Sequence, residues 1–246
     1  MMEWFENESF WVAYAPLMFD ASRWAEVPDA VDWITTVTAV SAPARILDLC
    51  CGVGRYSLEF ARRGFAVTGV DITQAYLNAL LESAIEENLS IEIARDDARK
   101  FSRPEQFDLC LNMFTSFGYF SNIDDDMQLL KTSCQNLKSG GRFILETIGK
   151  EISARDYCPY ESFVRLGWNV RVEYEVIGAW EGMKNRWILE NEQQRIDNAF
   201  ILRLYSATEL KRALFKAGFS SVRIFGGLDG RAYDHNALAL VALAEK

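Results

Sequence analysis

ILDLCCGVGRYSLEFARRGFAVTGVD, residues Ile46 to Asp71, contains in order an apolar strand, a glycine turn, a helix and a second strand that ends in an acid. Gly52 and Gly54 allow the chain to turn sharply and to approach a ligand that a Cβ atom would obstruct. The helix after the turn begins with free backbone N–H groups, and Asp71 is placed to accept hydrogen bonds from both hydroxyls of a ribose. The segment therefore predicts a pocket for an adenosine-containing ligand.

Two classes of ligand use this layout. In the dinucleotide fingerprint G-x-G-x-x-G, the third glycine lets the helix pack closely on the strand, but Ser57 occupies that position here. Asp48 lies four residues before Gly52, where a carboxylate repels a pyrophosphate and attracts a cationic amino acid. The spacing D-x-x-x-G-x-G resembles motif I of the class I S-adenosylmethionine (SAM) methyltransferases, whose cofactor carries a sulfonium and an ammonium group. A strand–turn–helix without any ligand is the remaining alternative.

The composition is that of an acidic, folded protein of 246 residues, with 50% hydrophobic and 13% aromatic residues. A net charge of −9 argues against a nucleic-acid partner, because phosphate binding requires a basic face. No apolar run reaches the length of a membrane span, and the acidic start lacks the basic residues of a signal peptide. Five scattered cysteines and a single histidine predict reduced thiols in a cytoplasmic protein, with no zinc site.

Strands and helices continue to alternate after Asp71. We expect a helix, a third strand that ends at Asp96 and Asp97, and an apolar fourth strand over 107–114. The next helix is expected to end at Gly140-Gly141, because glycine commonly terminates a helix, and a fifth strand follows it. Alternation at this spacing predicts a doubly wound parallel sheet.

From about Glu151 to Tyr205, apolar residues recur at every second position between turn residues. This period predicts an antiparallel β meander inserted after the fifth strand. Two final strands, over about 221–226 and 237–244, are separated by a turn too short for a helical crossover, so we expect them to pair antiparallel. The expected fold is an α/β, Rossmann-like, doubly wound seven-stranded sheet with an antiparallel last strand, as in class I methyltransferases, plus the inserted meander.

Three further segments resemble small-molecule methyltransferases, among them sugar N,N-dimethyltransferases and, more distantly, glycine N-methyltransferase. They are NMFTSFGYF (112–120), LKSGGRFILE (137–146) with Ser139 in place of the usual proline, and LRLYSATELKRALFKAGF (202–219). The resemblance covers most of residues 40–246. We expect four regions, namely an N-terminal helical lid (1–40), a SAM-binding core (41–150), the β insertion as substrate lid or dimer surface (151–205) and the rest of the core (206–246).

The resemblance also implies roles for single residues. The glycine turn would pack on the methionine part of SAM, Asp71 would bind the ribose, and Asp97 or its neighbour Asp96 would accept a hydrogen bond from the adenine amine. Arg55 either pairs with the SAM carboxylate or is a solvated side chain of the first helical turn. The expected cofactor residues are Asp48, Cys50, Gly52, Gly54, Asp71, Ile72, Asp96, Asp97, Ala98, Asn112 and Phe114.

Methyl transfer mainly requires an acceptor nucleophile held in line with the leaving sulfur. In the resembling family a tyrosine of the N-terminal helix often lies near the methyl group, and Tyr14 is the candidate. His235, the only histidine, is either a general base or a residue of a surface loop. Asn112, Ser116 and Tyr119 either position a polar acceptor or only shape their loop.

The sequence thus predicts a SAM-dependent enzyme that methylates an oxygen or nitrogen of a small-molecule acceptor, in the cytoplasm, with no nucleic-acid or membrane partner. A homodimer is one possible assembly. The alternatives are a non-catalytic SAM-binding protein, an NAD(P)-type oxidoreductase and a tRNA-directed methyltransferase.

Overall fold

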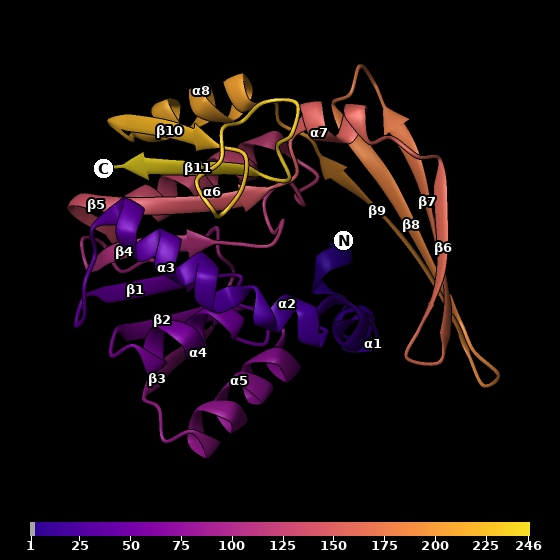
Figure 1. Ribbon diagram of the computed structural model, residues 1–246, viewed down its shortest axis with the longest axis horizontal. Coiled ribbons are helices and arrows are strands. Elements are labelled where there is room, and N and C mark those ends of the chain that lie inside the picture. Colours follow the sequence, from indigo (N-terminus) through magenta and orange to yellow (C-terminus); the bar gives the residue numbers. More distant parts are fainter. Residues whose placement is uncertain (1–2) are drawn as a thin grey trace.

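The computed structural model describes residues 3–246 and, within them, two separate sheets (Figure 1). The strands of the larger sheet are β1 (Arg45–Leu49), β2 (Ala66–Asp71), β3 (Ile91–Arg95), β4 (Phe107–Asn112), β5 (Leu137–Thr147), β10 (Ser221–Phe225) and β11 (Leu240–Glu245). The strands of the smaller sheet are β6 (Tyr160–Arg165), β7 (Trp168–Ile177), β8 (Gly182–Glu190) and β9 (Arg195–Arg203).

Helices precede, connect and cover these strands. They are the 3₁₀ helix η1 (Trp4–Glu6) and the α-helices α1 (Glu8–Met18), α2 (Ala21–Ala25), α3 (Val27–Thr38), α4 (Arg55–Arg62), α5 (Gln74–Glu86), α6 (Ile123–Asn136), α7 (Lys150–Arg155) and α8 (Ala207–Ala217). Residues 1–2 of the expected N-terminal lid lie outside the described residues. No helix in the described part of the chain combines the length and apolarity needed to cross a bilayer.

The larger sheet has the order β10-β11-β5-β4-β1-β2-β3, and β1 to β5 pair in parallel with one another. Strand β11 enters between β5 and β10 and is antiparallel to both. The smaller sheet is an antiparallel meander in chain order. The predicted seven-stranded fold with an antiparallel last strand and an inserted meander is therefore confirmed.

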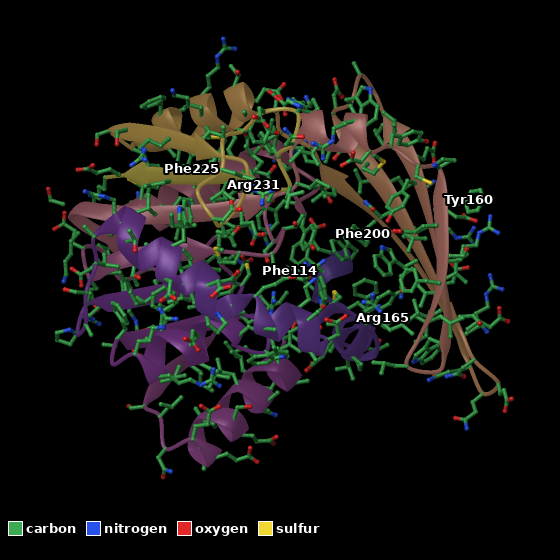
Figure 2. All side chains as sticks on the ribbon, viewed as in Figure 1. Phe114, Tyr160, Arg165, Phe200, Phe225 and Arg231 are labelled. Carbon is green, nitrogen blue, oxygen red and sulfur yellow. The ribbon has the colours of Figure 1, made fainter. Side chains whose placement is uncertain are left out.

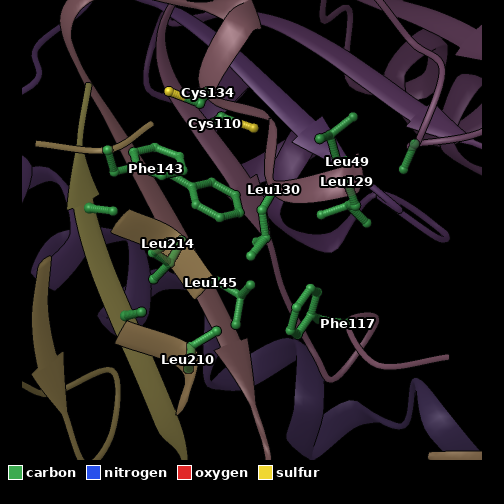
Figure 3. Packing of buried hydrophobic residues seen from close by; sticks show 14 of the residues in the cluster. Leu49, Cys110, Phe117, Leu129, Leu130, Cys134, Phe143, Leu145, Leu210 and Leu214 are labelled. Carbon is green, nitrogen blue, oxygen red and sulfur yellow. The ribbon is translucent and has the colours of Figure 1, made fainter. Parts of the chain in front are cut away.

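Alternate residues of the central strands pack against helices on opposite faces of the larger sheet. Leu47 and Leu49 of β1 share a cluster with α6 and α8, whereas Ile46 lies in a cluster with α3 and α4. Figure 3 shows Leu129 of α6 beside Leu49 of β1, and Leu130 on the side of Phe143 and Leu145 of β5. These strands are apolar at almost every position because both faces of the sheet are covered.

Helix α6 ends at Asn136, four residues before the expected stop at Gly140-Gly141. The carbonyls of Gln135 and Asn136 accept hydrogen bonds from the backbone of residues 105 and 106, and the Asn136 amide donates to Phe101 O at 2.9 Å. These contacts from the preceding loop occupy the backbone carbonyls that another helical turn would need as hydrogen-bond acceptors. Strand β5 therefore starts directly at Leu137, and the prediction for this helix end was wrong.

The N-terminal helix α1 packs on the inner face of the smaller sheet. Phe10, Tyr14 and Leu17 share a buried cluster with Val170, Val172 and Leu189 of that sheet. Figure 1 shows α1 between the two sheets. The outer face instead carries cross-strand ion pairs such as Arg186–Asp197 at 2.7 Å. The alternating pattern of the insertion thus follows one packed and one solvated face.

A buried acid joins α6 to the end of the smaller sheet. Asp126 is fully buried, and its Oδ2 accepts from Arg203 Nε at 2.9 Å and from the Tyr205 hydroxyl at 2.7 Å. Arg203 also donates through Nη2 to the carbonyls of Phe120 and Ser121. This network fixes the loop after β4 against the insertion.

Replacing Asp126 by alanine is expected to destabilise the protein by about 3 kcal/mol, because it leaves the Arg203 guanidinium without its buried counter-ion. The free energy of unfolding in urea measures the effect. Asp124→Ala is the matched control on the same helix, since Asp124 is exposed, and its loss should stay below about 1 kcal/mol. Equal losses in the two variants would contradict the role given to the network.

Candidate active site

A cavity of about 400 Å³ opens at the carboxyl ends of β1, β2 and β3, and this size lies within the ~300–1,000 Å³ of small-molecule sites. Further walls come from η1, α1, α2, the loop after β4 and the smaller sheet. Figure 2 shows Phe114 and Arg165, two lining residues, in the region between the two sheets. In doubly wound folds this strand edge is where ligands bind.

The predicted glycine turn lies on the wall of the cavity, but its two glycines serve different purposes. Gly52 has a φ of +56° and lines the cavity, where an added Cβ would lie 3.4 Å from Phe19 Cζ. Gly54 has a φ of +82° and lies outside the lining, and a Cβ there would collide with Leu80 of α5. Helix packing therefore requires Gly54, and only Gly52 leaves room for a ligand.

Asp71 fixes this turn to the end of β2. Its Oδ2 accepts from Gly52 N at 2.9 Å, and its Oδ1 accepts from Thr73 N at 2.8 Å. Burial raises the pKa of Asp71, and the backbone hydrogen bonds oppose that rise. Each oxygen keeps acceptor capacity in addition to its backbone bond, and the residue lines the cavity.

Asp48 is buried beneath the same turn and also lines the cavity. Its Oδ2 accepts from Ser57 Oγ at 2.6 Å. Burial raises the pKa of Asp48 to about 6, and the bond from Ser57 limits the rise. The serine that replaces the third glycine of the dinucleotide fingerprint thus serves as the hydrogen-bond donor to this acid.

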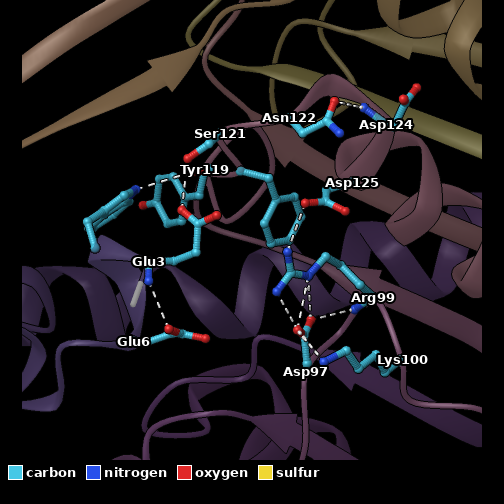
Figure 4. A network of polar contacts seen from close by, with 12 residues as sticks. Glu3, Glu6, Asp97, Arg99, Lys100, Tyr119, Ser121, Asn122, Asp124 and Asp125 are labelled. Atoms are coloured by element: carbon cyan, nitrogen blue, oxygen red, sulfur yellow. Dashed lines mark hydrogen bonds and ion pairs between the residues drawn. The ribbon is translucent and has the colours of Figure 1, made fainter. Parts of the chain in front are cut away.

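The acids after β3 have different surroundings. Asp97 accepts from Arg99 Nη2 at 2.6 Å and from the Arg99 backbone at 2.9 Å (Figure 4). Burial alone would raise the pKa of Asp97, but the hydrogen bonds from Arg99 hold it below its usual range. Within residues 3–246, Asp96 accepts only from Asp97 N, at 2.8 Å. Both acids line the cavity, and Asp96 has the freer carboxylate for a ligand.

Arg55 is 5% exposed and lines the cavity, so its interpretation as a solvated side chain was wrong. Its Nη1 donates to Arg23 O at 2.8 Å, and its guanidinium lies 4.4 Å from the centre of the Phe114 ring. Among residues 3–246, no carboxylate forms an ion pair with it within 4.0 Å. Burial lowers the pKa of Arg55, and Glu146 and Glu26 oppose that shift from beyond ion-pair distance. A ligand carboxylate in the cavity can supply the direct partner that this buried cation lacks among residues 3–246.

Nine of the eleven expected cofactor residues line the cavity, and Gly54 and Asn112 do not. Asn112 is fully buried and donates through Nδ2 to Leu49 O at 3.1 Å, so it ties β4 to β1. The nine that line it are Asp48, Cys50, Gly52, Asp71, Ile72, Asp96, Asp97, Ala98 and Phe114.

The structure brings neither expected catalytic residue to the cavity. Tyr14 is 1% exposed, and its hydroxyl donates to Trp187 O at 3.0 Å because α1 turns this face toward the smaller sheet. His235 is exposed in the loop between β10 and β11, beside Asn236. Neither side chain is therefore placed to act on a ligand in this cavity.

Sequence reasoning did not identify Arg23 and Arg165, which also line the cavity. Tyr119 was a candidate, and its ring is held by Trp4 and Trp11 at centroid distances of 4.7 and 6.2 Å. Its hydroxyl has no hydrogen-bond partner in the described part of the chain, and burial raises its pKa. For Tyr119 the aromatic loop was the signal in the sequence that could identify it. Arg23 and Arg165 lie in segments without a motif, so no sequence signal pointed to them.

Residues 46–141 match the family model described as a methyltransferase domain. A ubiquinone biosynthesis O-methyltransferase of Aeromonas salmonicida (strain A449) is 28% identical over 149 residues, which are 54% of this chain and 60% of that protein. One of Pseudomonas syringae pv. tomato is 30% identical over 131 residues, 52% of this chain and 53% of that protein. The chain thus spans about half to three fifths of the length of these relatives.

Among solved structures, a SAM-dependent methyltransferase from Clostridium acetobutylicum superposes with a TM-score of 0.78 at 16% identity, covering 96% of this chain and 97% of that one. An amino pentose methyltransferase from Micromonospora echinaspora, solved with bound SAM, gives 0.68 at 20% identity, with 96% of each chain covered. At these identities the likeness shows the fold. Together the findings confirm the resemblance to SAM-dependent methyltransferases, and residues 46–141 are the part of the chain that matches the methyltransferase-domain model.

Proposed function

We propose that the chain binds SAM in this cavity and transfers its methyl group to an oxygen or nitrogen of a small molecule. One observation carries the proposal: the cavity wall holds the buried guanidinium of Arg55, which has no ion pair within residues 3–246, together with the buried carboxylate of Asp48. The amino-acid part of SAM has a carboxylate and an ammonium group, which complement these two charges. A dinucleotide pyrophosphate has no cation for Asp48.

The remaining contacts follow from the positions of the strand ends. Asp71 would accept from the ribose hydroxyls with the lone pairs that its backbone bonds leave free. Ile72 would pack on the adenine, and Asp96, the acid without an ion pair to Arg99, would accept from the adenine amine. In this proposal Gly52 is the position where the backbone approaches the methionine part.

In the proposed reaction, a lone pair of the acceptor forms a bond to the methyl carbon while the carbon–sulfur bond breaks. The electron pair of that bond passes to sulfur and yields neutral S-adenosylhomocysteine, and the acceptor releases one proton. Burial keeps the Tyr119 hydroxyl protonated, so it would position the acceptor through a hydrogen bond and not act as a base. Catalysis would come mainly from proximity and orientation.

The proposed function also includes the cellular compartment of the protein and the segments that close its site. A reducing compartment such as the cytoplasm suits it, because all five cysteines are free and two of them, Cys50 and Cys51, line the cavity. The N-terminal helices and the β insertion would close the site over the donor and the acceptor.

Calorimetry with S-adenosylhomocysteine, followed by a screen of radiolabelled SAM against phenols, amines, amino acids and sugars, tests the function. We expect S-adenosylhomocysteine to bind and at least one acceptor to gain label. Binding of NAD⁺ without binding of S-adenosylhomocysteine would overturn the proposal in favour of an oxidoreductase.

Two variants separate the contacts to the two halves of the donor. Arg55→Gln should weaken S-adenosylhomocysteine about tenfold or more and leave 5′-methylthioadenosine unchanged, because only the former has the carboxylate. Asp71→Ala should weaken both ligands by about 1.5–3 kcal/mol, since both carry the ribose. Titration calorimetry measures the dissociation constants of both ligands for both variants. Equal losses of affinity for the two ligands in Arg55→Gln would show that Arg55 does not bind the carboxylate.

The affinity for S-adenosylhomocysteine should depend on pH through Asp48. The ligand ammonium attracts the ionised carboxylate, and the pKa of Asp48 in the free protein is about 6. Affinity is therefore expected to fall as the pH decreases below about 6, by up to about tenfold per pH unit. In Asp48→Asn the side chain can still accept the hydrogen bond from Ser57 but no longer titrates. The part of the pH dependence of S-adenosylhomocysteine affinity that comes from Asp48 should therefore disappear between pH 5 and 7. Identical pH profiles for the two proteins would contradict the contact.

Tyr119→Phe should lower kcat about tenfold, the effect of one lost hydrogen bond to the acceptor of about 1.4 kcal/mol. The affinity for S-adenosylhomocysteine should stay the same. Tyr157→Phe, which changes a largely exposed tyrosine, is the control. A drop in donor affinity without a change in kcat would place Tyr119 at the donor and not at the acceptor.

A further inference from the structure

We propose that the acceptor carries an anionic acid group, and that Arg165, next to the turn between β6 and β7, binds it. The inference rests on the proposed function, because it takes the strand ends as the place of the methyl donor. It adds the chemical class of the acceptor and a residue that selects it.

Three guanidinium groups line the cavity, and each uses only one terminal nitrogen for hydrogen bonds or ion pairs within residues 3–246. Arg23 contacts Glu26 through Nη1, and Arg55 donates to Arg23 O through Nη1. Arg165 Nη1 donates to Leu17 O at 3.1 Å and lies 3.0 Å from Asp20 Oδ2. The Nε and Nη2 groups of all three arginines have no protein partner within residues 3–246, and the side chains of Arg23 and Arg165 are 49% and 44% exposed.

Two arginines outside the cavity lining, Arg99 and Arg63, use their guanidinium nitrogens more fully than these three. Arg99 engages Asp97 and Asp125 through Nε, Nη1 and Nη2. Arg63 likewise uses all three of these nitrogens on Glu59, Asp32 and Pro28. A free Nε–Nη2 edge is the part of the guanidinium that binds a carboxylate or phosphate through two parallel bonds.

The methyl donor accounts for only part of this positive charge. Its single carboxylate belongs beside Arg55 and Arg23, whose guanidinium groups lie 4.4 and 5.6 Å from the centre of the same Phe114 ring. Arg165 reaches the cavity from the smaller sheet, with its guanidinium 5.2 Å from the Phe163 ring centre. The Nε–Nη2 edge of Arg165 therefore remains free after the donor carboxylate is bound beside Arg55 and Arg23.

Other residues that line the cavity from outside the core describe the rest of the acceptor. Leu17 and Met18 of α1 line the cavity, as do Trp11 and Trp187. The cavity acids Asp48, Asp71, Asp96 and Asp97 all come from the ends of β1, β2 and β3. The segments added to the core thus offer apolar and aromatic surface with a cation, which suits a small aromatic acid.

Benzoate, phenyl phosphate and the neutral benzamide probe this site by calorimetry, both with saturating S-adenosylhomocysteine and without it. We expect an anion to bind at least about tenfold more tightly than benzamide, because the Nε–Nη2 edge of Arg165 forms two charge-assisted hydrogen bonds with it. Arg165→Gln should remove most of that preference and leave benzamide and S-adenosylhomocysteine unchanged. Arg171→Gln, on the outer face of β7 where Arg171 pairs with Glu173, should retain the preference.

Asp20→Asn tests whether Arg165 binds an anion or only joins the insertion to the N-terminal segment through its ion pair with Asp20. Asp20→Asn and Arg165→Gln both break this pair, whose length is 3.0 Å, while asparagine at position 20 can still cap α2. If Arg165 binds the anion, Asp20→Asn should keep or strengthen benzoate binding, whereas Arg165→Gln weakens it. Equal losses of benzoate affinity in both variants would mean that Arg165 has only a structural role, and would overturn the inference.

Two more results would overturn it: equal binding of benzoate, phenyl phosphate and benzamide, or no measurable binding of any of them. Tighter binding of phenyl phosphate than of benzoate would support the anion site and name a phosphate ester as the acceptor class. Failure of S-adenosylhomocysteine to bind would count against the proposed function instead, and the anion preference of the free protein would still decide the role of Arg165.

Discussion

The carboxylate of Asp71 holds the two turns on which the cavity depends. Parallel pairing of β1 with β2 brings the glycine turn beside the end of β2, and Asp71 then accepts from the backbone of both Gly52 and Thr73. A buried carboxylate is tolerated only when hydrogen bonds compensate its lost hydration. The same bonds therefore oppose the rise in the pKa of Asp71 that burial causes, and they hold the glycine turn beside the end of β2.

Much of this arrangement is local, which is why the sequence could predict it. The turn and Asp71 lie within one strand–turn–helix–strand unit, and parallel strands leave little choice about where their ends meet. The antiparallel last strand followed from the length of one connection. The end of α6 did not follow, because the carbonyls of Gln135 and Asn136 are taken by a loop some thirty residues earlier in the chain, and no pattern around Gly140 reveals that contact.

The side chains nearest the proposed acceptor were harder to predict. Whether a tyrosine offers its hydroxyl to a ligand depends on which partner it finds in the fold. Tyr14 finds Trp187 O, 173 residues away in the sequence, whereas the Tyr119 hydroxyl finds no partner among the described residues. Arg55 was ambiguous for the same reason, since burial under Phe19 and Phe114 depends on how the N-terminal segment folds over the turn.

The charges of the cavity divide between the core and the segments added to it. The acids that suit the donor lie at strand ends inside residues 46–141, the part that matches the methyltransferase domain. Arg23 and Arg165 lie outside that part, one before it and one in the insertion. The relatives align with this chain over only 60% and 53% of their own length. The acceptors named for those relatives consequently give no guide to the acceptor here, and selectivity has to be sought in the N-terminal segment and the smaller sheet.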